Sequence, residues 1–177
     1  MANHAVMIPS KIAAMYDGAL LRNVVSASNI DNGNVLVLSS VSGTTGEGEV
    51  FVGTAPTAAS AICWMAGEPE IPFGTAGANT YRGIGNIQDF YNSASKVFTA
   101  FKPQAGDIIT LTAEAFDTAP SAYAITADAT YTLKASAVAT TGLCLKYLNT
   151  TYIPSASGSA IGTGRITAYR MEVVSNS

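Results

Sequence analysis

Charged side chains are scarce in this sequence. Asp, Glu, Lys and Arg make up 12% of the 177 residues, against about 25% in ordinary soluble domains. The formal net charge is only −3, and no cluster of Lys and Arg alternates with aromatic residues. Because binding to nucleic acid depends on concentrated positive charge, we expect no nucleic acid partner.

The residues that carry most enzyme and metal chemistry are also rare. His4 is the only histidine, and Cys63 and Cys144 are the only cysteines. One imidazole and two distant thiols cannot supply a zinc site, and nothing near His4 indicates a Ser–His or Cys–His nucleophile. We therefore expect a protein that is not an enzyme, with no catalytic residue, cofactor or metal. The two cysteines are expected to be buried thiols and not a disulfide.

Long apolar runs are missing as well. No run approaches the roughly 18 to 20 residues that a membrane-spanning helix needs, and residues 1–11 lack the basic segment and apolar core of a secretory signal. We expect synthesis in a cytoplasm and no membrane association. The mean hydropathy is nevertheless +0.26. A positive value with so few charges indicates a surface that is partly buried against neighbouring subunits, so we expect self-association.

The sequence does contain a succession of short β-rich runs that are separated by turn residues. This rhythm is typical of an antiparallel β-barrel or β-sandwich, so the expected class is mainly β. The loop at residues 43–48 joins two runs that we expect to pair as a hairpin. The expected strands lie at residues 35–38, 49–52, 61–65, 107–116, 122–126, 130–135, 143–148 and 165–174.

One short helix and an N-terminal arm complete the expected architecture. Apolar residues recur at offsets of three and four between Ile87 and Phe101, which predicts a helix behind an Asn86 cap. Residues 1–33 show no sustained period, and we interpret them as an extended arm with one helical turn. The Asp31-Asn32-Gly33 turn then opens a single β-rich domain, residues 34–177.

Five motifs occur in an order that resembles small head proteins of tailed bacteriophages, the kind that decorate or cement capsids. The likeness covers roughly residues 28–117, and its motifs are Ser28–Val35, Gly46–Phe51, Ala66–Glu70, Phe90–Phe101 and Gly106–Phe116. It implies a structural protein of the virion, made in the host cytoplasm, that binds the outer surface of the capsid. The implied partners are the major capsid protein and further copies of the chain, with a trimer favoured.

The arm is the part of the chain that we expect to contact these partners, because a segment that orders on binding can cover a large surface. Under the resemblance it would reach over a capsid subunit or a neighbouring copy. The residues expected to make the contact are His4, Met7, Ile8, Ile12, Met15 and Tyr16.

Two alternative functions stay open. The chain could be a tail-tube or other assembly subunit of the virion, which would polymerise into rings. It could instead be a carbohydrate-binding or receptor-binding module, which needs an exposed aromatic platform. The residues available for such a platform are Trp64, Tyr81, Tyr91, Tyr147 and Tyr152.

Overall fold

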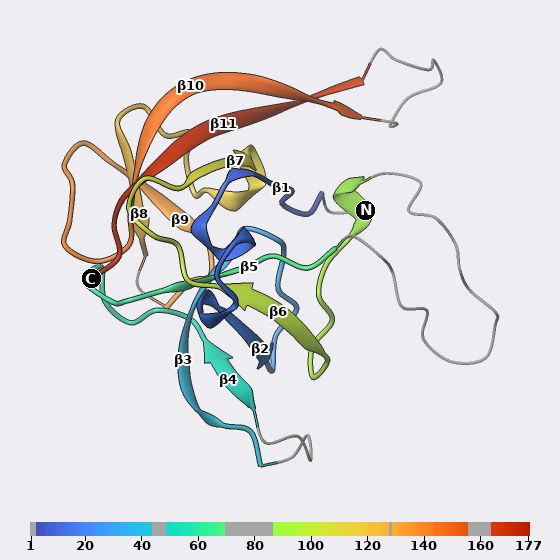
Figure 1. Ribbon diagram of the computed structural model, residues 1–177. Coiled ribbons are helices and arrows are strands. Elements are labelled where there is room, and N and C mark those ends of the chain that lie inside the picture. Colours follow the sequence, from blue (N-terminus) through green and yellow to red (C-terminus); the bar gives the residue numbers. More distant parts are fainter. Residues whose placement is uncertain (1–2, 44–48, 70–86, 128, 156–163) are drawn as a thin grey trace.

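Two β layers make up the molecule (Figure 1). The computed structural model describes residues 3–43, 49–69, 87–127, 129–155 and 164–177. One layer is a six-stranded sheet, and the other is a closed five-stranded barrel. The mainly β class with a barrel is therefore confirmed, and the expected loops at residues 72–85 and 154–164 lie largely outside the described residues.

The six-stranded sheet is antiparallel throughout. Its outer strands are the first and the ninth strands in sequence, whereas the last strand in sequence lies near its centre. In spatial order the strands are β1 (Met7–Lys11), β7 (Ile108–Thr112), β11 (Gly164–Ser175), β10 (Cys144–Ser155), β8 (Tyr123–Thr126) and β9 (Leu133–Ser136).

The barrel uses one parallel pair, β2 with β4, and is otherwise antiparallel. The hairpin that we predicted is present, since β3 pairs with β4 and places Val37 opposite Thr54. Closure of the barrel leaves it with no free strand edge. In spatial order its strands are β2 (Leu21–Val25), β4 (Val50–Thr54), β3 (Val35–Val41), β5 (Trp64–Ala66) and β6 (Val97–Phe101).

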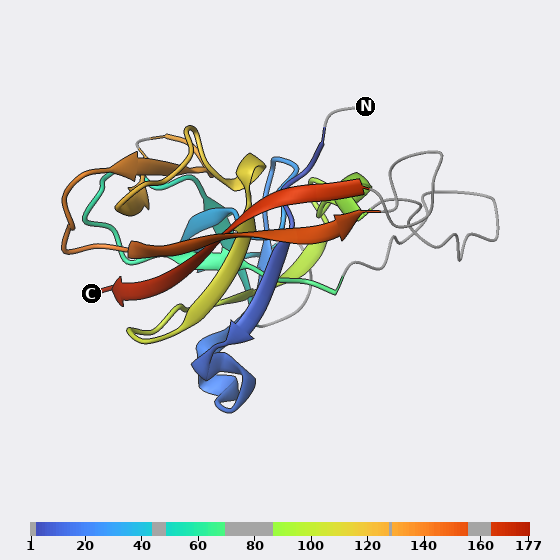
Figure 2. The ribbon, with the colours of Figure 1, turned by 90° about the horizontal axis from the view of Figure 1, so that it is seen from above.

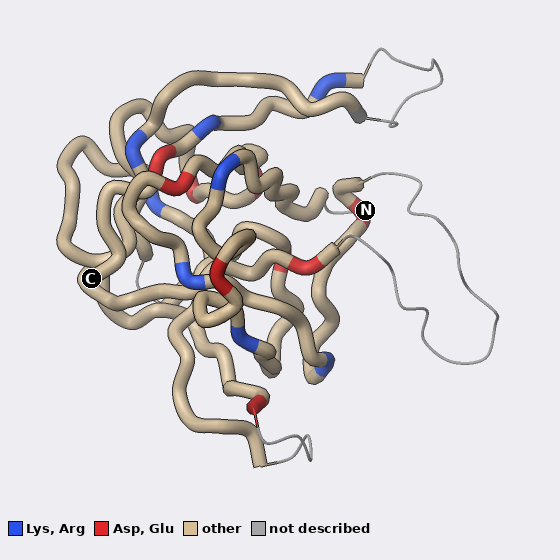
Figure 3. The backbone as a smooth tube through the Cα atoms, in the orientation of Figure 1, with Lys and Arg blue, Asp and Glu red and all other residues tan. Residues whose placement is uncertain are grey.

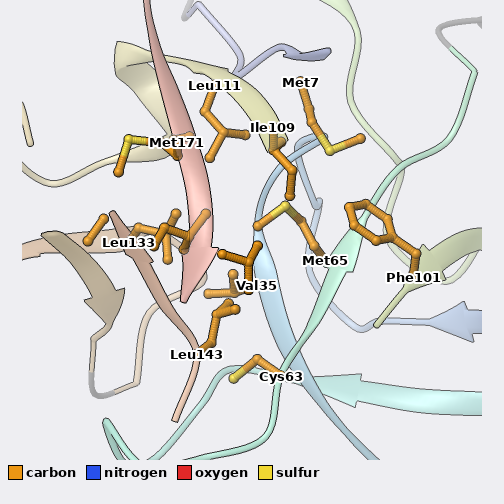
Figure 4. Close-up of a cluster of buried hydrophobic side chains, with 14 of the residues drawn as sticks. Met7, Val35, Cys63, Met65, Phe101, Ile109, Leu111, Leu133, Leu143 and Met171 are labelled. Atoms are coloured by element: carbon orange, nitrogen blue, oxygen red, sulfur yellow. The ribbon is translucent and has the colours of Figure 1, made fainter. Parts of the chain in front are cut away.

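The main hydrophobic core lies between the two layers (Figure 4). Alternate residues of a strand point to opposite faces, so Ile109 and Leu111 of β7 reach the same core. Figure 4 shows Ile109 and Leu111 facing Val35 and Met65, which belong to the barrel. Two smaller clusters flank this core. One contains Val24, Ile30, Leu36, Ala66, Phe98 and Ala100, and the other contains Val6, Ile153, Ile166 and Ala168.

Gly33 lies where the layers meet. Its φ of +89° is a left-handed conformation, which glycine adopts without a steric penalty. Its N–H donates to the Ala66 carbonyl at 2.8 Å. A Cβ at this position would be 2.5 Å from Leu111 Cδ2. The glycine thus serves both the turn and the close approach of the sheet to the barrel.

The helix predicted from Ile87 to Phe101 is wrong. Only a short 3-10 helix, η3 (Ile87–Asp89), forms there, and Ser95 with a φ of 60° precedes strand β6. Phe98 and Ala100 are buried on one face of β6. Strand pairing with β2 and β5 therefore overrides the helical spacing, and Asn86 lies outside the described residues.

The segment predicted as an arm lies mostly within the two layers. Strand β1 pairs with β7, placing Met7 opposite Leu111, and β2 pairs with β6, placing Val24 opposite Phe98. Met7 and Val24 are buried because they fill the clusters on the two layers. Between these strands two 3-10 helices, η1 (Ala13–Met15) and η2 (Gly18–Leu20), project from the body (Figure 2).

Candidate interaction surface

The structure separates the six residues that we expected to contact a partner. Met7 and Ile12 are buried in the main core, and His4 is half-buried. Ile8 is partly exposed on β1, whereas Met15 is 62% and Tyr16 is 89% exposed at the end of η1. Met15 and Tyr16 are therefore the strongest candidates for contact with another protein.

The turn that carries these two side chains is fixed by hydrogen bonds. The Tyr16 N–H donates to the Ala13 carbonyl at 2.9 Å, which closes η1. The Asp17 carboxylate accepts the Ala19 N–H at 2.9 Å and caps η2. A fixed turn loses little entropy when it binds, so its exposed side chains are already placed for a partner.

A buried carboxylate attaches this turn to the sheet. Asp107, just before β7, accepts the Ala13 N–H at 2.8 Å with one oxygen and the Gln104 N–H at 2.8 Å with the other. The Asp107 side chain is buried, and its two backbone donors compensate for the loss of water. The position of η1 is therefore set by the same strand that forms the main core.

Arg22 lies beside this turn in a stacked arrangement. The carbon of its guanidinium is 5.4 Å from the ring centre of Trp64 and 5.9 Å from that of Phe51. Nη1 donates to the carbonyls of Ala19 at 3.0 Å and Leu21 at 2.7 Å. Within the described ranges Arg22 forms no ion pair with a carboxylate. Arg, Trp and Tyr are the residues that most often dominate protein–protein binding energy.

Two open hollows meet at Leu21. The first, about 420 Å³, is lined by Gly18, Leu21, Arg22, Asn23, Glu49 and Phe51. The second, about 270 Å³, has a largely apolar lining that includes Met7, Ile12, Met15, Leu21 and Phe101. Leu21 is itself exposed. We call Met15, Tyr16, Leu21 and Arg22 the turn surface.

His4 forms the one ion pair found among the described residues. Its Nδ1 lies 2.7 Å from Asp31 Oδ1, and its ring is 4.7 Å from that of Tyr91. The second carboxylate oxygen of Asp31 accepts the Ala5 N–H at 2.9 Å. A His–Asp pair is two thirds of a hydrolase triad, but no described hydroxyl or thiol hydrogen-bonds this ring. The pair instead ties residues 4–5 to the turn before β3.

The cysteines are buried and free, as predicted. Burial raises the pKa of the Cys63 thiol to about 12, so it stays protonated and is a poor nucleophile near neutral pH. In the part of the chain that the structure describes, no group of three or more His, Cys, Asp or Glu side chains could hold a metal ion.

The described residues of the possible aromatic platform lie in three parts of the fold, with Tyr147 and Tyr152 both on β10. Trp64 on β5 stacks with Arg22, and Tyr91 follows η3 and stacks with His4. Tyr152 on β10 is 57% exposed and has Arg165 5.9 Å from its ring centre. The two others are Tyr147, whose hydroxyl is 2.8 Å from that of Thr150, and Tyr81, which lies outside the described residues.

Charges are distributed singly over both layers (Figure 3). No area of one sign dominates the view, so the described surface offers no concentrated field that would attract a polyanion. None of the helices in the described ranges has the length and apolar character needed to cross a bilayer.

Sequence reasoning missed Leu21 and Arg22 of the turn surface. The sequence offers no local signal for the Arg22 stack, because its aromatic partners lie on β4 and β5, far along the chain. Comparison of the chain with protein-family models, with curated proteins and with solved structures finds no match.

Proposed function

We propose that this chain is a non-enzymatic structural subunit of a phage virion, which binds the outer surface of the capsid and decorates or cements it. The observation that carries the proposal is the exposure of Met15 and Tyr16 on a turn that Asp107 holds in place. The scarcity of charge and the resemblance of residues 28–117 to phage head proteins support the same reading. The proposed partner is the major capsid protein, and the proposed location is the capsid surface of the virion.

The size of the turn surface suits a protein that binds in many copies. Full burial of one large apolar side chain contributes about 1.5 to 3 kcal/mol, and Met15, Tyr16 and Leu21 all have exposed area left to bury. Contacts of this strength are modest for one copy. They add up when neighbouring copies also associate, because linked binding sites reinforce one another. On the capsid, an arrangement of copies around a local threefold axis would fit this role.

The experiment uses phage heads prepared without the chain. Purified protein is added to these heads, and the bound fraction is measured by sedimentation. We expect saturable binding of the wild-type protein and at least about tenfold weaker binding of a Met15→Ala/Tyr16→Ala variant, since a loss of 1.4 kcal/mol corresponds to a factor of ten.

Val138→Ala is the matched control, because Val138 is an exposed apolar residue on the loop after β9. It should bind as the wild type does. Both variants should keep their unfolding free energy within about 0.5 kcal/mol, as expected for exposed positions. Wild-type protein that does not sediment with the heads, or a double variant that binds equally well, would contradict the proposal.

Two further measurements distinguish the alternatives. Stacked rings of the purified protein in electron micrographs would favour a tail-tube subunit over a capsid protein. Binding on a glycan array that is lost on Tyr152→Ala would favour a carbohydrate-binding module, because Tyr152 is the most exposed described aromatic residue of the possible platform.

A further inference from the structure

The outer strands of the six-stranded sheet are β1 and β9, and the outer side of β9 is bridged at Leu133 by Phe116. Within the described residues, two stretches of the inner strands also lack a neighbour on one side. The far half of β10 extends beyond β8, and Gly164–Thr167 of β11, which include a glycine and Arg165, extend beyond β7. An unpaired edge presents free N–H and C=O groups that can pair with another chain, so soluble proteins usually protect such edges.

The two outer strands carry such protection. Strand β1 spans five residues, contains Pro9 and Lys11, and has an irregular register between them. Strand β9 spans four residues and contains Lys134. Proline, lysine, irregularity and short length all discourage the addition of another strand.

The free edge of β10 is longer and has no lysine between Leu148 and Ile153, and its register shift and its proline, Pro154, lie at the two ends of this stretch. β10 pairs with β8 only from Cys144 to Lys146, and the Tyr147 N–H makes the last contact, with the Ala122 carbonyl at 2.8 Å. From Leu148 onward the described structure places β11 on one edge of β10 and no strand on the other. Figure 1 shows β10 and β11 continuing past the rest of the sheet as a two-stranded ribbon.

The composition of this edge is suited to strand pairing. Residues 148–153 read Leu-Asn-Thr-Thr-Tyr-Ile and contain no charge, glycine or proline. Neutral segments of about six residues with high β-propensity are those that most readily add to another strand. A two-stranded ribbon is also only marginally stable in water, whereas a sheet of three or more strands is stable.

One face of the ribbon is already covered, and the other is open. Ile153 and Ile166 pack with Val6, and Ile87 lies against them. On the opposite face Leu148, Thr150 and Tyr152 are exposed. A strand added at the β10 edge would cover part of this exposed face as well as the free backbone groups.

We propose that the free edge of β10 pairs with the same edge of a second copy of this chain, antiparallel and about a twofold axis. The two ribbons then form one four-stranded sheet. A second copy fits because the edge is neutral, so identical strands do not repel each other. It also fits because antiparallel self-pairing lets both copies use the same residues.

We place the axis at Thr150, the middle of the exposed residues Leu148, Thr150 and Tyr152. The twofold symmetry then puts Leu148 opposite Tyr152 of the second copy, and Asn149 opposite Thr151 of the second copy. An apolar–aromatic pair and a hydrogen-bonding pair are both favourable across antiparallel strands. This contact is separate from the turn surface, so a chain that binds no capsid would still form it.

The first test places a charge on the axis. Sedimentation of the wild-type protein over a range of concentrations should show a dimer. Thr150→Lys should sediment as a monomer, because two ammonium groups would face each other. A mixture of Thr150→Lys with Thr150→Glu should recover the dimer. Thr167→Lys is the matched control, since Thr167 is exposed on β11 of the same ribbon, and it should leave the dimer unchanged.

The second test is covalent. Thr150→Cys should form a disulfide-linked dimer on mild oxidation, because Cα atoms in directly opposite positions of antiparallel strands lie about 4.5 to 5.5 Å apart, within the range that a disulfide spans. Thr167→Cys should not. Cys63 and Cys144 are buried and should not form the intermolecular disulfide themselves.

Two outcomes would overturn the proposal of strand pairing. One is a wild-type protein that is monomeric at all concentrations, and the other is an oligomer whose mass Thr150→Lys leaves unchanged. If that unchanged oligomer is a trimer, the proposal of strand pairing fails but the proposal of capsid binding still stands.

Discussion

Substitution of Gly33 by alanine should destabilise the protein for two separate reasons. The φ of +89° at Gly33 is unfavourable for alanine, which costs about 1 to 2 kcal/mol. The new Cβ would also lie 2.5 Å from Leu111 Cδ2 and 3.5 Å from Met7 Cβ. Insertion of a methyl group into a packed core costs about 1 to 3 kcal/mol. We therefore expect Gly33→Ala to lower the free energy of unfolding by about 2 to 5 kcal/mol.

Gly106 provides the control that separates the two terms. Its φ is +93°, but a Cβ there would have no heavy atom within 4 Å. Gly106→Ala should therefore cost only the backbone term, about 1 to 2 kcal/mol. Urea unfolding followed by the fluorescence of Trp64, the single tryptophan, measures both variants. If Gly33→Ala loses no more stability than Gly106→Ala, the argument that Gly33 is needed for the approach of the two layers is wrong.

A double-mutant cycle tests the contact directly. Leu111→Val removes the Cδ atoms that the alanine would meet. In that background Gly33→Ala should cost about as much as Gly106→Ala, since only the backbone term would be left. An unchanged cost in the Leu111→Val background would show that the strain lies elsewhere.

Three further predictions concern groups that hold the elements together. Because burial raises the pKa of Cys63 from 9.0 to about 12, the folded protein should not react with a thiol reagent near neutral pH. Stability that depends on this protonated thiol should be fully present below pH 9.0 and fall as the pH rises to about 12, which urea titrations at several pH values would show. Asp107→Ala should cost about 1 to 3 kcal/mol for each backbone N–H that it leaves without an acceptor, and hydrogen exchange should reveal faster opening of η1. Asn176→Ala removes hydrogen bonds to the N–H and C=O of Cys63, so exchange of the Cys63 amide should accelerate.

The strands were predictable where local chemistry and long-range pairing agree. Val35–Val41 and Val50–Thr54 are β-rich runs joined by a loop, and they pair as expected. Between Ile87 and Phe101 the local pattern and the long-range pairing disagree. Apolar spacing there suits a helix, but Phe98 and Ala100 also alternate correctly for a strand. This segment forms a strand because β2 and β5 pair with it on either side. No local sequence pattern indicates that pairing.

The exposure of the candidate residues could be predicted only in part, and their contact with a partner stays a prediction. The apolar residues of the N-terminal segment include Met15 and Tyr16, which are exposed. The same reasoning could not separate them from Met7 and Ile12, because burial depends on strands that come about 100 residues later. Arg22 could not be predicted, since its stacking depends on how the barrel closes.

The central place of β11 in the sheet has a consequence for synthesis. β11 separates β7 from β10, and it is the last strand of the described chain to leave the ribosome. Strand β1 must also wait for β7, a delay of roughly 5 to 20 seconds at typical elongation rates. The six-stranded sheet therefore cannot be completed until β11 has been synthesised. A chain that stops before residue 164 would hold β1–β7 and β10–β8–β9 as two separate fragments, each with exposed edges, and would be a substrate for chaperones or proteases and not a partly functional protein.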